Sequence, residues 1–197
     1  MRIVIATTNS GKLKELRQLA QANTDVEFVL APDTFAVEET GSTFEENAAI
    51  KARAAAELTG LIAIADDSGI EVEALDGRPG IYSARYCEGS DRDRRLKLLK
   101  ELEPVAESKR GAAFVCAMAI CLPTGQTIFT SKARWEGRIG FTEKGENGFG
   151  FDPIFVLPDS NLTAAEISED EKNQISHRGQ AFRQVVNFLQ TELKKTV

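Results

Sequence analysis

Residues 61–72 read LIAIADDSGIEV, and this stretch carries the strongest single signal for the fold. The apolar run at 61–65 is typical of a buried β-strand. It ends in two adjacent aspartates, Asp66 and Asp67. Two carboxylates at the tip of a buried strand repel each other, and removing either one from water costs free energy. Something nearby must therefore make the pair tolerable.

The carboxylate pair has two interpretations. Ligands in open α/β sheets gather at the carboxyl ends of strands, and Mg²⁺ binds there through one or two carboxylates together with substrate phosphates. A divalent cation would let both aspartates stay ionised. The alternative is structural: one aspartate caps a turn at Ser68-Gly69, and the other faces solvent.

Predicted strands and helices alternate along the rest of the chain. Strands are expected at 2–7, 26–30 and 70–75, as a hairpin over 112–137 that turns at 123–125, and at the end of 149–158. Helices are expected after the first strand (Leu13, Leu16 and Leu19), at 43–58, at 93–102, from near Thr163, and from near Ser176, where Phe182, Val185, Val186, Leu189 and Leu193 share one face. Capping boxes fit Ser42 to Glu45 and Thr163 to Glu166, and Gly60 fits a helix end. The alternation predicts an α/β fold with a mixed sheet.

The composition is that of one globular domain spanning 1–197. Of the 197 residues, 42% are hydrophobic and 27% are charged, which suits a single domain of ordinary type. No apolar stretch reaches the ~18 residues of a membrane span, and the N-terminus reads as a first strand and not as a signal peptide. The net charge of −6 argues against a general duplex-binding protein, which is normally basic. We therefore expect no membrane and no nucleic-acid partner.

The cysteine and histidine content narrows the chemistry further. Cys116 and Cys121 fall in an apolar stretch and are expected in the core. Three cysteines without metal-ligand spacing fit a reducing cytoplasm. His177 is the single histidine, which excludes a His-rich zinc site. Because the chain is acidic overall, an anionic ligand would need local cations or a metal ion.

The stretch TTNSGK at 7–12 follows a predicted strand and opens a helix. Backbone N–H groups and the helix dipole favour an anion there, and Lys12 adds a positive charge. The stretch is not a Walker A loop, because Leu13 follows Lys12 and Ala6 stands where the first glycine should be. The structural alternative is an ordinary capped helix start with a solvated lysine.

Three other polar stretches are ambiguous when taken alone. Glu38-Glu39 reads as a solvated acidic loop, and Asn47 and Lys51 share a helix face as a plain surface pair. NGFGFDP at 147–153 combines glycines that admit close approach with aromatic rings that can stack on a base, or it is a tight turn whose rings enter the core. ISHRGQ at 175–180 places cations at a helix start, which needs an acidic neighbour or a suitable ligand.

Taken together, these stretches resemble the inosine triphosphate pyrophosphatase family, also called the non-standard purine nucleoside triphosphate pyrophosphatases. TTNSGKLKEL matches the N-terminal T-x-N-x-x-K signature, and the later blocks match in order as EETGSTFEENAAIKA, ADDSGIEVEALDGRPGIYSARY, GFGFDPIF and EKNQISHRGQA. The resemblance covers essentially the whole chain. It implies a long central sheet flanked by helices, two lobes with an active-site cleft between them, and a homodimer. It also implies hydrolysis of ITP, dITP and XTP to the monophosphate and pyrophosphate with Mg²⁺ in the cytoplasm.

The resemblance assigns roles to individual positions. The phosphate grip would consist of Thr7, Thr8, Asn9, Ser10, Gly11, Lys12 and Lys51. Mg²⁺ would be held by Glu38 or Glu39 with Asp66 and Asp67, and Asp67 would also accept a proton from the attacking water. Ser68 would touch the substrate, and Phe149 would stack on the base with Gly150, Phe151 and Asp152 as its wall. The purine edge would be read by Lys172, His177 and Arg178.

The last assignment has a chemical reason. Hypoxanthine and xanthine carry an oxygen at C6 where adenine carries an amine, so cationic donors suit the first two and leave the amine unsatisfied. Three alternatives stay open. They are a Maf-type pyrophosphatase for other nucleotides, a nucleotide-binding sensor without catalysis, and a phosphatase with an aspartyl nucleophile, for which D-x-D and not adjacent aspartates would be expected.

Overall fold

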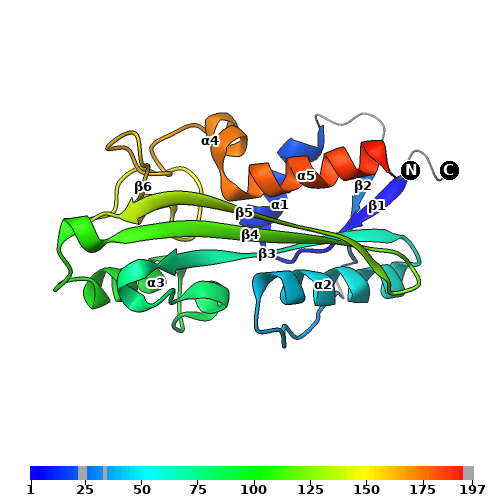
Figure 1. Ribbon diagram of the computed structural model, residues 1–197, viewed down its shortest axis with the longest axis horizontal. Coiled ribbons are helices and arrows are strands. Elements are labelled where there is room, and N and C mark those ends of the chain that lie inside the picture. Colours follow the sequence, from blue (N-terminus) through cyan, green and yellow to red (C-terminus); the bar gives the residue numbers. More distant parts are fainter. Residues whose placement is uncertain (22–25, 33–34, 193–197) are drawn as a thin grey trace. The chain divides into compact units, whose positions relative to one another are not determined.

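The computed structural model describes residues 1–21, 26–32 and 35–192, along which strands and helices alternate (Figure 1). The strands are β1 (Arg2–Ile5), β2 (Glu27–Leu30), β3 (Ile62–Val72), β4 (Gly111–Cys121), β5 (Thr127–Ile139) and β6 (Phe155–Val156). The α-helices are α1 (Ser10–Gln21), α2 (Phe44–Thr59), α3 (Asp91–Glu101), α4 (Glu169–Ile175) and α5 (His177–Thr191). Within these residues, no helix combines the length and the apolar character that crossing a bilayer requires.

The six strands form one mixed sheet in the order β2-β1-β3-β4-β5-β6. β1 pairs in parallel with both β2 and β3, whereas β5 and β6 pair antiparallel. The long hairpin between β4 and β5 closes at 122–126, where the Leu122 N–H donates to the Gln126 carbonyl at 2.9 Å. The predicted α/β class with a mixed sheet is confirmed, and so are the hairpin and its turn.

The chain divides into two compact units, which we describe separately. Unit 1 comprises 1–67, 116–133 and 178–197, and unit 2 comprises 68–115 and 134–177. The boundaries fall inside β3, β4 and β5 and at the first residue of α5. Each of these elements therefore contributes residues to both units.

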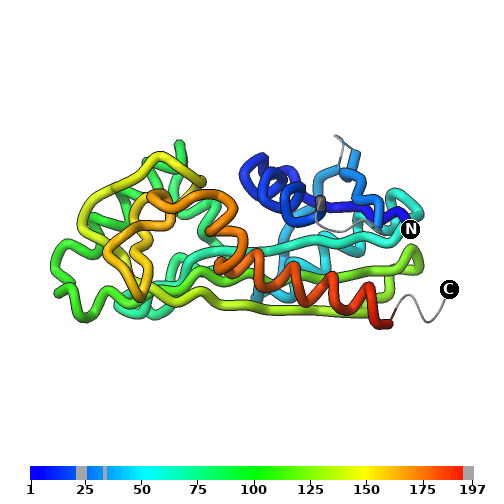
Figure 2. Tube along the Cα trace, turned by 90° about the horizontal axis from the view of Figure 1, so that it is seen from above, coloured from blue at the N-terminus to red at the C-terminus, as the bar shows by residue number. Residues whose placement is uncertain are grey.

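In unit 1, helices cover both faces of the sheet. Ile3 and Ile5 of β1 belong to a buried cluster with side chains from α1 and α5, among them Leu16, Phe182 and Val185. The intervening Val4 points to the opposite face by the alternation of a strand, and α2 contacts β1 there (Figures 1 and 2). Cys116 and Cys121 are fully buried, as the sequence predicted.

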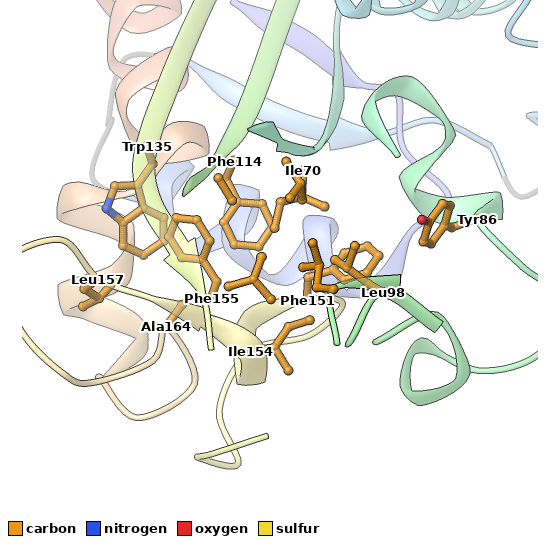
Figure 3. Close-up of a cluster of buried hydrophobic side chains, with 14 of the residues drawn as sticks. Ile70, Tyr86, Leu98, Phe114, Trp135, Phe151, Ile154, Phe155, Leu157 and Ala164 are labelled. Carbon is orange, nitrogen blue, oxygen red and sulfur yellow. The ribbon is translucent and has the colours of Figure 1, made fainter. Parts of the chain in front are cut away.

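Unit 2 has its own core, rich in aromatic side chains. Phe114 of β4 packs against Phe155 with ring centroids 4.5 Å apart, and Trp135 of β5 lies 5.2 Å from the same ring. Leu98 of α3 and Phe151 pack into this cluster (Figure 3). The core therefore joins α3 to the segment that follows β5.

Helix α2 is capped one residue later than the sequence predicted. Its N-cap is Thr43, whose hydroxyl accepts the Glu46 N–H, and the Glu46 carboxylate accepts from the Ser42 N–H and hydroxyl. The box predicted at Ser42 to Glu45 is therefore wrong by one position. Gly60 ends the helix in the left-handed region with φ of 66°, as expected.

Two other predicted boundaries are wrong. The Thr163 N–H does donate to the Glu166 carboxylate at 2.7 Å, but this contact closes a turn, and α4 begins later, after the N-cap Ser168. The strand predicted at 70–75 is the second half of β3, and residues 73–75 form a 3₁₀ turn. Leu193, predicted on the apolar face of α5, lies outside the described residues.

Candidate active site

The two adjacent aspartates lie inside β3, next to the carboxyl end of β1. Ile5, the last residue of β1, pairs with Ile64 of β3, two positions before Asp66. The prediction that the strand ends at the aspartates is wrong, and the alternative of a turn at Ser68-Gly69 is wrong with it. The strand end that is free to gather ligands is that of β1, because the chain leaves the sheet there.

Residues 7–12 form the polar loop after β1 and the first turn of α1. Asn9 caps the helix, since its Oδ1 accepts the Lys12 N–H at 3.0 Å, while the Thr7 hydroxyl accepts the Asn9 N–H at 3.2 Å. Thr8, Asn9 and Ser10 are exposed, and Thr7, Gly11 and Lys12 are half-buried. N–H groups in the first turn of a helix lack partners within it, so this turn suits an anion.

Asp66 is a buried anion held between two cations. Its Oδ2 lies 3.0 Å from Lys12 Nζ and 3.4 Å from Arg178 Nε. Burial alone would raise the pKa of Asp66, but the charges of Lys12 and Arg178 outweigh it and hold the pKa well below its usual range. Arg178 also pairs with the buried Glu15 of α1. Asp66 therefore stays ionised and organises the cations around it.

Asp67, the next residue, is shifted in the opposite direction. Burial raises its pKa, Lys51 and Lys12 oppose the shift, and Glu39 and Asp66 add to it. Lys51 Nζ lies 2.5 Å from Glu39 Oε1 and 3.5 Å from Asp67 Oδ1, so one ammonium group contacts both carboxylates. Burial alone would lower the pKa of Lys51, but the surrounding carboxylates raise it. Two carboxylates whose pKa values move apart can take different chemical roles.

Asn47 ties Asp67 to the loop that carries Glu39. Asn47 is fully buried on α2, its Nδ2 donates to Asp67 Oδ2 at 3.2 Å, and its Oδ1 accepts the Gly41 N–H at 2.8 Å. A Cβ at Gly41 would lie 2.7 Å from that same Oδ1, so only glycine fits without displacement. Asn47 therefore orients a carboxylate that the sequence singled out.

The described part of unit 1 can be tested as a site for Mg²⁺. No three Asp, Glu, His or Cys side chains converge there as a complete protein cage. Mg²⁺ does not need one, because it keeps waters and takes one or two carboxylates plus substrate phosphates. Glu39 and Asp67 converge on Lys51, and Asp66 Oδ1 is buried without a hydrogen-bond partner among the described residues. These hard oxygen donors fit the ion, and the exposed Glu38 is less well placed than Glu39.

We refer to these ionic residues of unit 1 as the charged network. Its members are Lys12, Glu15, Glu39, Lys51, Asp66, Asp67 and Arg178.

Unit 2 holds a second group, in which one ion pair lies against aromatic rings. Lys172 Nζ lies 2.6 Å from Asp152 Oδ2, and both side chains are almost fully buried. The same oxygen accepts the Phe149 N–H at 2.7 Å, and Lys172 Nζ lies 5.0 Å from the centroid of the Phe149 ring. Phe149 as a whole residue is half-buried.

His177 lies among other aromatic rings of unit 2. It is buried and stacks on Phe114, with centroids 4.8 Å apart and planes 8° apart, and its ring lies 6.3 Å from Trp135. Phe151, predicted in the wall around the base, is 6% exposed and packs in the core of unit 2. We refer to Phe114, Trp135, Phe149, Asp152, Lys172 and His177 as the aromatic group.

The structure sorts the predicted site residues between these two sets. Arg178, grouped with Lys172 and His177 in the prediction, forms ion pairs with Glu15 and Asp66 of the charged network. Ser68 follows Asp67 in β3 and belongs to unit 2, where it is half-buried.

Sequence reasoning missed three kinds of contact. Glu15, three residues after Lys12 on α1, gave no sign of pairing with a residue far along the chain. Asn47 left one signal, its four-residue spacing from Lys51 on the same helix. Asp91 and Arg95 of α3 contact Gly150, and nothing in their spacing indicated this.

Comparison with known proteins identifies the family of this chain. The model of the Ham1 family matches residues 3–188. The dITP/XTP pyrophosphatase of Nitratidesulfovibrio vulgaris is 50% identical over 196 residues, covering 94% of each chain, and that of Exiguobacterium sibiricum is 47% identical, covering 98% of this chain and 99% of the relative. A HAM1 protein from Coxiella burnetii, whose structure has been solved, superposes with a TM-score of 0.85 at 43% identity, covering 96% of this chain and 98% of that one. This chain therefore belongs to the Ham1 family.

Proposed function

We propose that this protein hydrolyses deaminated purine nucleoside triphosphates, dITP and XTP together with ITP, to the monophosphate and pyrophosphate. Support comes from relatives that are named dITP/XTP pyrophosphatases and are about half identical over nearly the whole chain. The observation that carries the proposal is the charged network: Lys12 and Lys51 contact adjacent aspartates of β3, beside the first turn of α1. Lysines and a helix start suit a polyphosphate, and a buried carboxylate with a raised pKa suits a proton acceptor.

The chain's own residues divide the work on the phosphates. Thr7, Thr8, Asn9, Ser10 and Gly11 offer hydroxyl, amide and backbone donors to the triphosphate, and Lys12 and Lys51 supply positive charge. Water cleaves the anhydride bond between the α and β phosphoryl groups, and Asp67 accepts the proton that the water loses. Asp66, held ionised, keeps Lys12 and Arg178 in position.

Mg²⁺ is the cofactor in this proposal. Glu39 and Asp67 would hold it, with Asp66 beside them and Glu38 as the less favoured ligand. When bound, the ion would neutralise charge that develops on the phosphates. Asn47, which bonds both Asp67 and Gly41, would hold Asp67 and the Glu39 loop in position to bind the ion.

The base is the ligand of the aromatic group in this proposal. Phe149 would stack on the purine, beside Ser68 and Gly150, and Phe151 would support it from the core. Lys172, oriented by Asp152, would donate to the C6 oxygen, with His177 at the purine edge. Arg178, which is ion-paired with Glu15 and Asp66, is the third residue that we propose for this edge.

Four further features belong to the proposal. They are one functional domain over 1–197, a cleft between two lobes, a homodimer and a cytoplasmic location. No observation above tests them, and each stays a prediction.

Product analysis with Mg²⁺ tests the function directly. We expect dITP and XTP to give the monophosphate and pyrophosphate, with dATP, dTTP and UTP turned over far more slowly. Preference for dTTP or UTP would indicate a Maf-type activity, and release of a diphosphate with inorganic phosphate would indicate a different hydrolase. Tight binding of dITP without any turnover would indicate a sensor.

A further inference from the structure

The peptide groups on either side of the Gly150 Cα are held by the first turns of α3. The Gly150 N–H donates to Asp91 Oδ2 at 2.8 Å, and the Gly150 carbonyl accepts from Arg95 Nη1 at 2.7 Å. Gly150 has φ of 61°, in the left-handed region that favours glycine. One helix therefore grips both the donor and the acceptor of a single loop residue.

Both gripping side chains are themselves braced. Asp91 Oδ1 lies 2.7 Å from Arg94 Nη2, and Arg95 Nε lies 2.5 Å from Glu143 Oε1. Arg95 is only 14% exposed at its side chain. Burial alone would raise the pKa of Asp91, but the hydrogen bonds from Arg94 and from the Gly150 N–H lower it, which keeps the carboxylate ionised at neutral pH. A planar guanidinium with two fixed partners holds its position better than a lysine could.

Gly150 is the chain neighbour of Phe149, the half-buried phenylalanine of the aromatic group. Phe149 directly precedes Gly150, and its N–H is bonded to Asp152, which also orients Lys172. The loop is thus fixed on one side by Asp152 and on the other by α3. Any shift of Gly150 would change the direction in which the Phe149 ring points.

We propose that Asp91 and Arg95 are positioning residues that fix the loop on which a nucleotide base stacks. They act through Gly150 on Phe149 and touch neither phosphate nor metal ligands. This inference rests on the proposed function, because it takes a purine base as the ligand of the aromatic group. It predicts that α3 controls affinity for the base end of the substrate and leaves the chemical step alone.

Arg95→Gln tests the proposal, with Arg92→Gln as a matched control. Arg92 also pairs with Glu143, but its side chain is 70% exposed, and it is Arg95 that donates to the Gly150 carbonyl. For Arg95→Gln we expect the KM for dITP and the Kd for dIMP to rise about tenfold, the size expected for loss of one hydrogen bond from a charged donor. We expect kcat and the inhibition constant of pyrophosphate to stay within about twofold, because neither depends on the loop.

Two further variants separate positioning from general damage to the fold. Arg95→Lys keeps the charge but offers one nitrogen where Arg95 uses Nη1 for Gly150 and Nε for Glu143, so it should recover part of the dIMP affinity. Asp91→Asn retains one acceptor oxygen for two donors and should weaken dIMP binding less than Arg95→Gln does. Melting temperatures of all four variants establish that each is folded under the assay conditions.

The outcomes distinguish this inference from the proposed function. If wild-type protein does not hydrolyse dITP, the proposed function fails, and dIMP binding alone then tests the positioning role of Asp91 and Arg95. The positioning role is contradicted if wild-type protein does not bind dIMP, or if Arg95→Gln weakens dIMP binding no more than Arg92→Gln does. An equal loss of dIMP and pyrophosphate binding would also overturn it, because the effect would then be general.

Discussion

The charged network of unit 1 and the aromatic group of unit 2 solve the problem of buried charge in different ways. In the charged network, lysines and an arginine alternate with carboxylates, so that Lys12, Asp66 and Arg178 form one continuous chain of ion pairs. In the aromatic group, the ion pair Lys172–Asp152 lies against the Phe149 ring, and His177 stacks on Phe114. The first arrangement suits a ligand with several charges, and the second suits a flat, neutral ligand with a few polar edges.

This contrast predicts that substitutions in the two sets have different effects on nucleotide selectivity. Substitutions in the charged network should change turnover of every nucleotide by a similar factor. Substitutions in the aromatic group should instead change the ratio between one base and another. A variant that behaves in the opposite way would show that the two sets are wrongly assigned.

The largest effect is expected for Asp67→Asn. Without a proton acceptor at this position, kcat should fall about 10³-fold for dITP and XTP alike. Burial raises the pKa of Asp67 in the folded protein, so its ionised form disfavours folding at neutral pH. Because Asp67→Asn removes this charge, the metal-free variant should melt no lower than wild type at neutral pH. Steady-state kinetics measure kcat, and thermal melts measure the stability. Glu71→Gln, on the same strand but paired with Arg134, is the control. If Asp67→Asn kept a tenth of the wild-type kcat, Asp67 would not be the proton acceptor.

Asp66→Asn should act mainly on stability. The half-buried Lys12 would lose this anion, and the buried Arg178 would keep only Glu15 of its two described carboxylate partners, which should lower the free energy of unfolding by about 3 kcal/mol in urea titrations at neutral pH. Because the folded pKa of Asp66 is lowered, its stabilisation is complete above the ordinary pKa of 3.8 and is lost as pH falls through the folded value. The variant should therefore lose less stability than wild type on acidification. The exposed Asp76→Asn provides a reference, and equal stability of the two variants would contradict the prediction.

Lys172→Met should reduce the preference for dITP over dATP by about 10- to 100-fold, because a charged donor to the C6 oxygen is lost. It also leaves Asp152 buried without its cation, so some stability should be lost. The double variant Lys172→Met/Asp152→Asn should recover stability but not the preference. Competition assays between the two nucleotides measure the ratio, and an unchanged ratio would exclude Lys172 from reading the base.

The smallest effect is expected for Asn47→Ala. Removing the amide frees Asp67 and the Gly41 loop from each other, which should lower kcat/KM about tenfold and raise the Mg²⁺ concentration needed for half-maximal rate. Both values should change by the same factor for every nucleotide. If kcat/KM fell by different factors for different bases, Asn47 would not act through Asp67 of the charged network.

Local sequence patterns predicted most of the elements of this fold. The apolar periodicity of α1 and α5, the hairpin turn at 123–125 and the stop at Gly60 all depend on neighbours within a few residues, and all are confirmed. The start of α4 was missed for the opposite reason. Thr163 and Glu166 do form the contact that suggests a helix, yet the chain uses it to close a turn.

Contacts between distant parts of the chain were beyond local reasoning. Adjacent aspartates predicted the end of a strand at Asp66, but β3 continues through them, and Lys12 of α1 and Arg178 of α5 neutralise that aspartate. The same ion pairs connect Arg178 to Lys12 through Asp66, which local patterns could not indicate. Motif resemblance selected residues that the structure gathers into two sets, but it did not indicate which cation contacts which carboxylate.

The buried thiol beside Asp66 gives the charged network an intrinsic reporter. Cys116 is fully buried with Sγ 4.0 Å from Asp66 Oδ2, and burial, together with Asp66, raises its pKa to about 12. The reactive thiolate is therefore suppressed as long as unit 1 is closed, whereas Cys87 is only half-buried. The rate at which an alkylating reagent modifies Cys116 would then measure local opening of unit 1 around Asp66 without any added label.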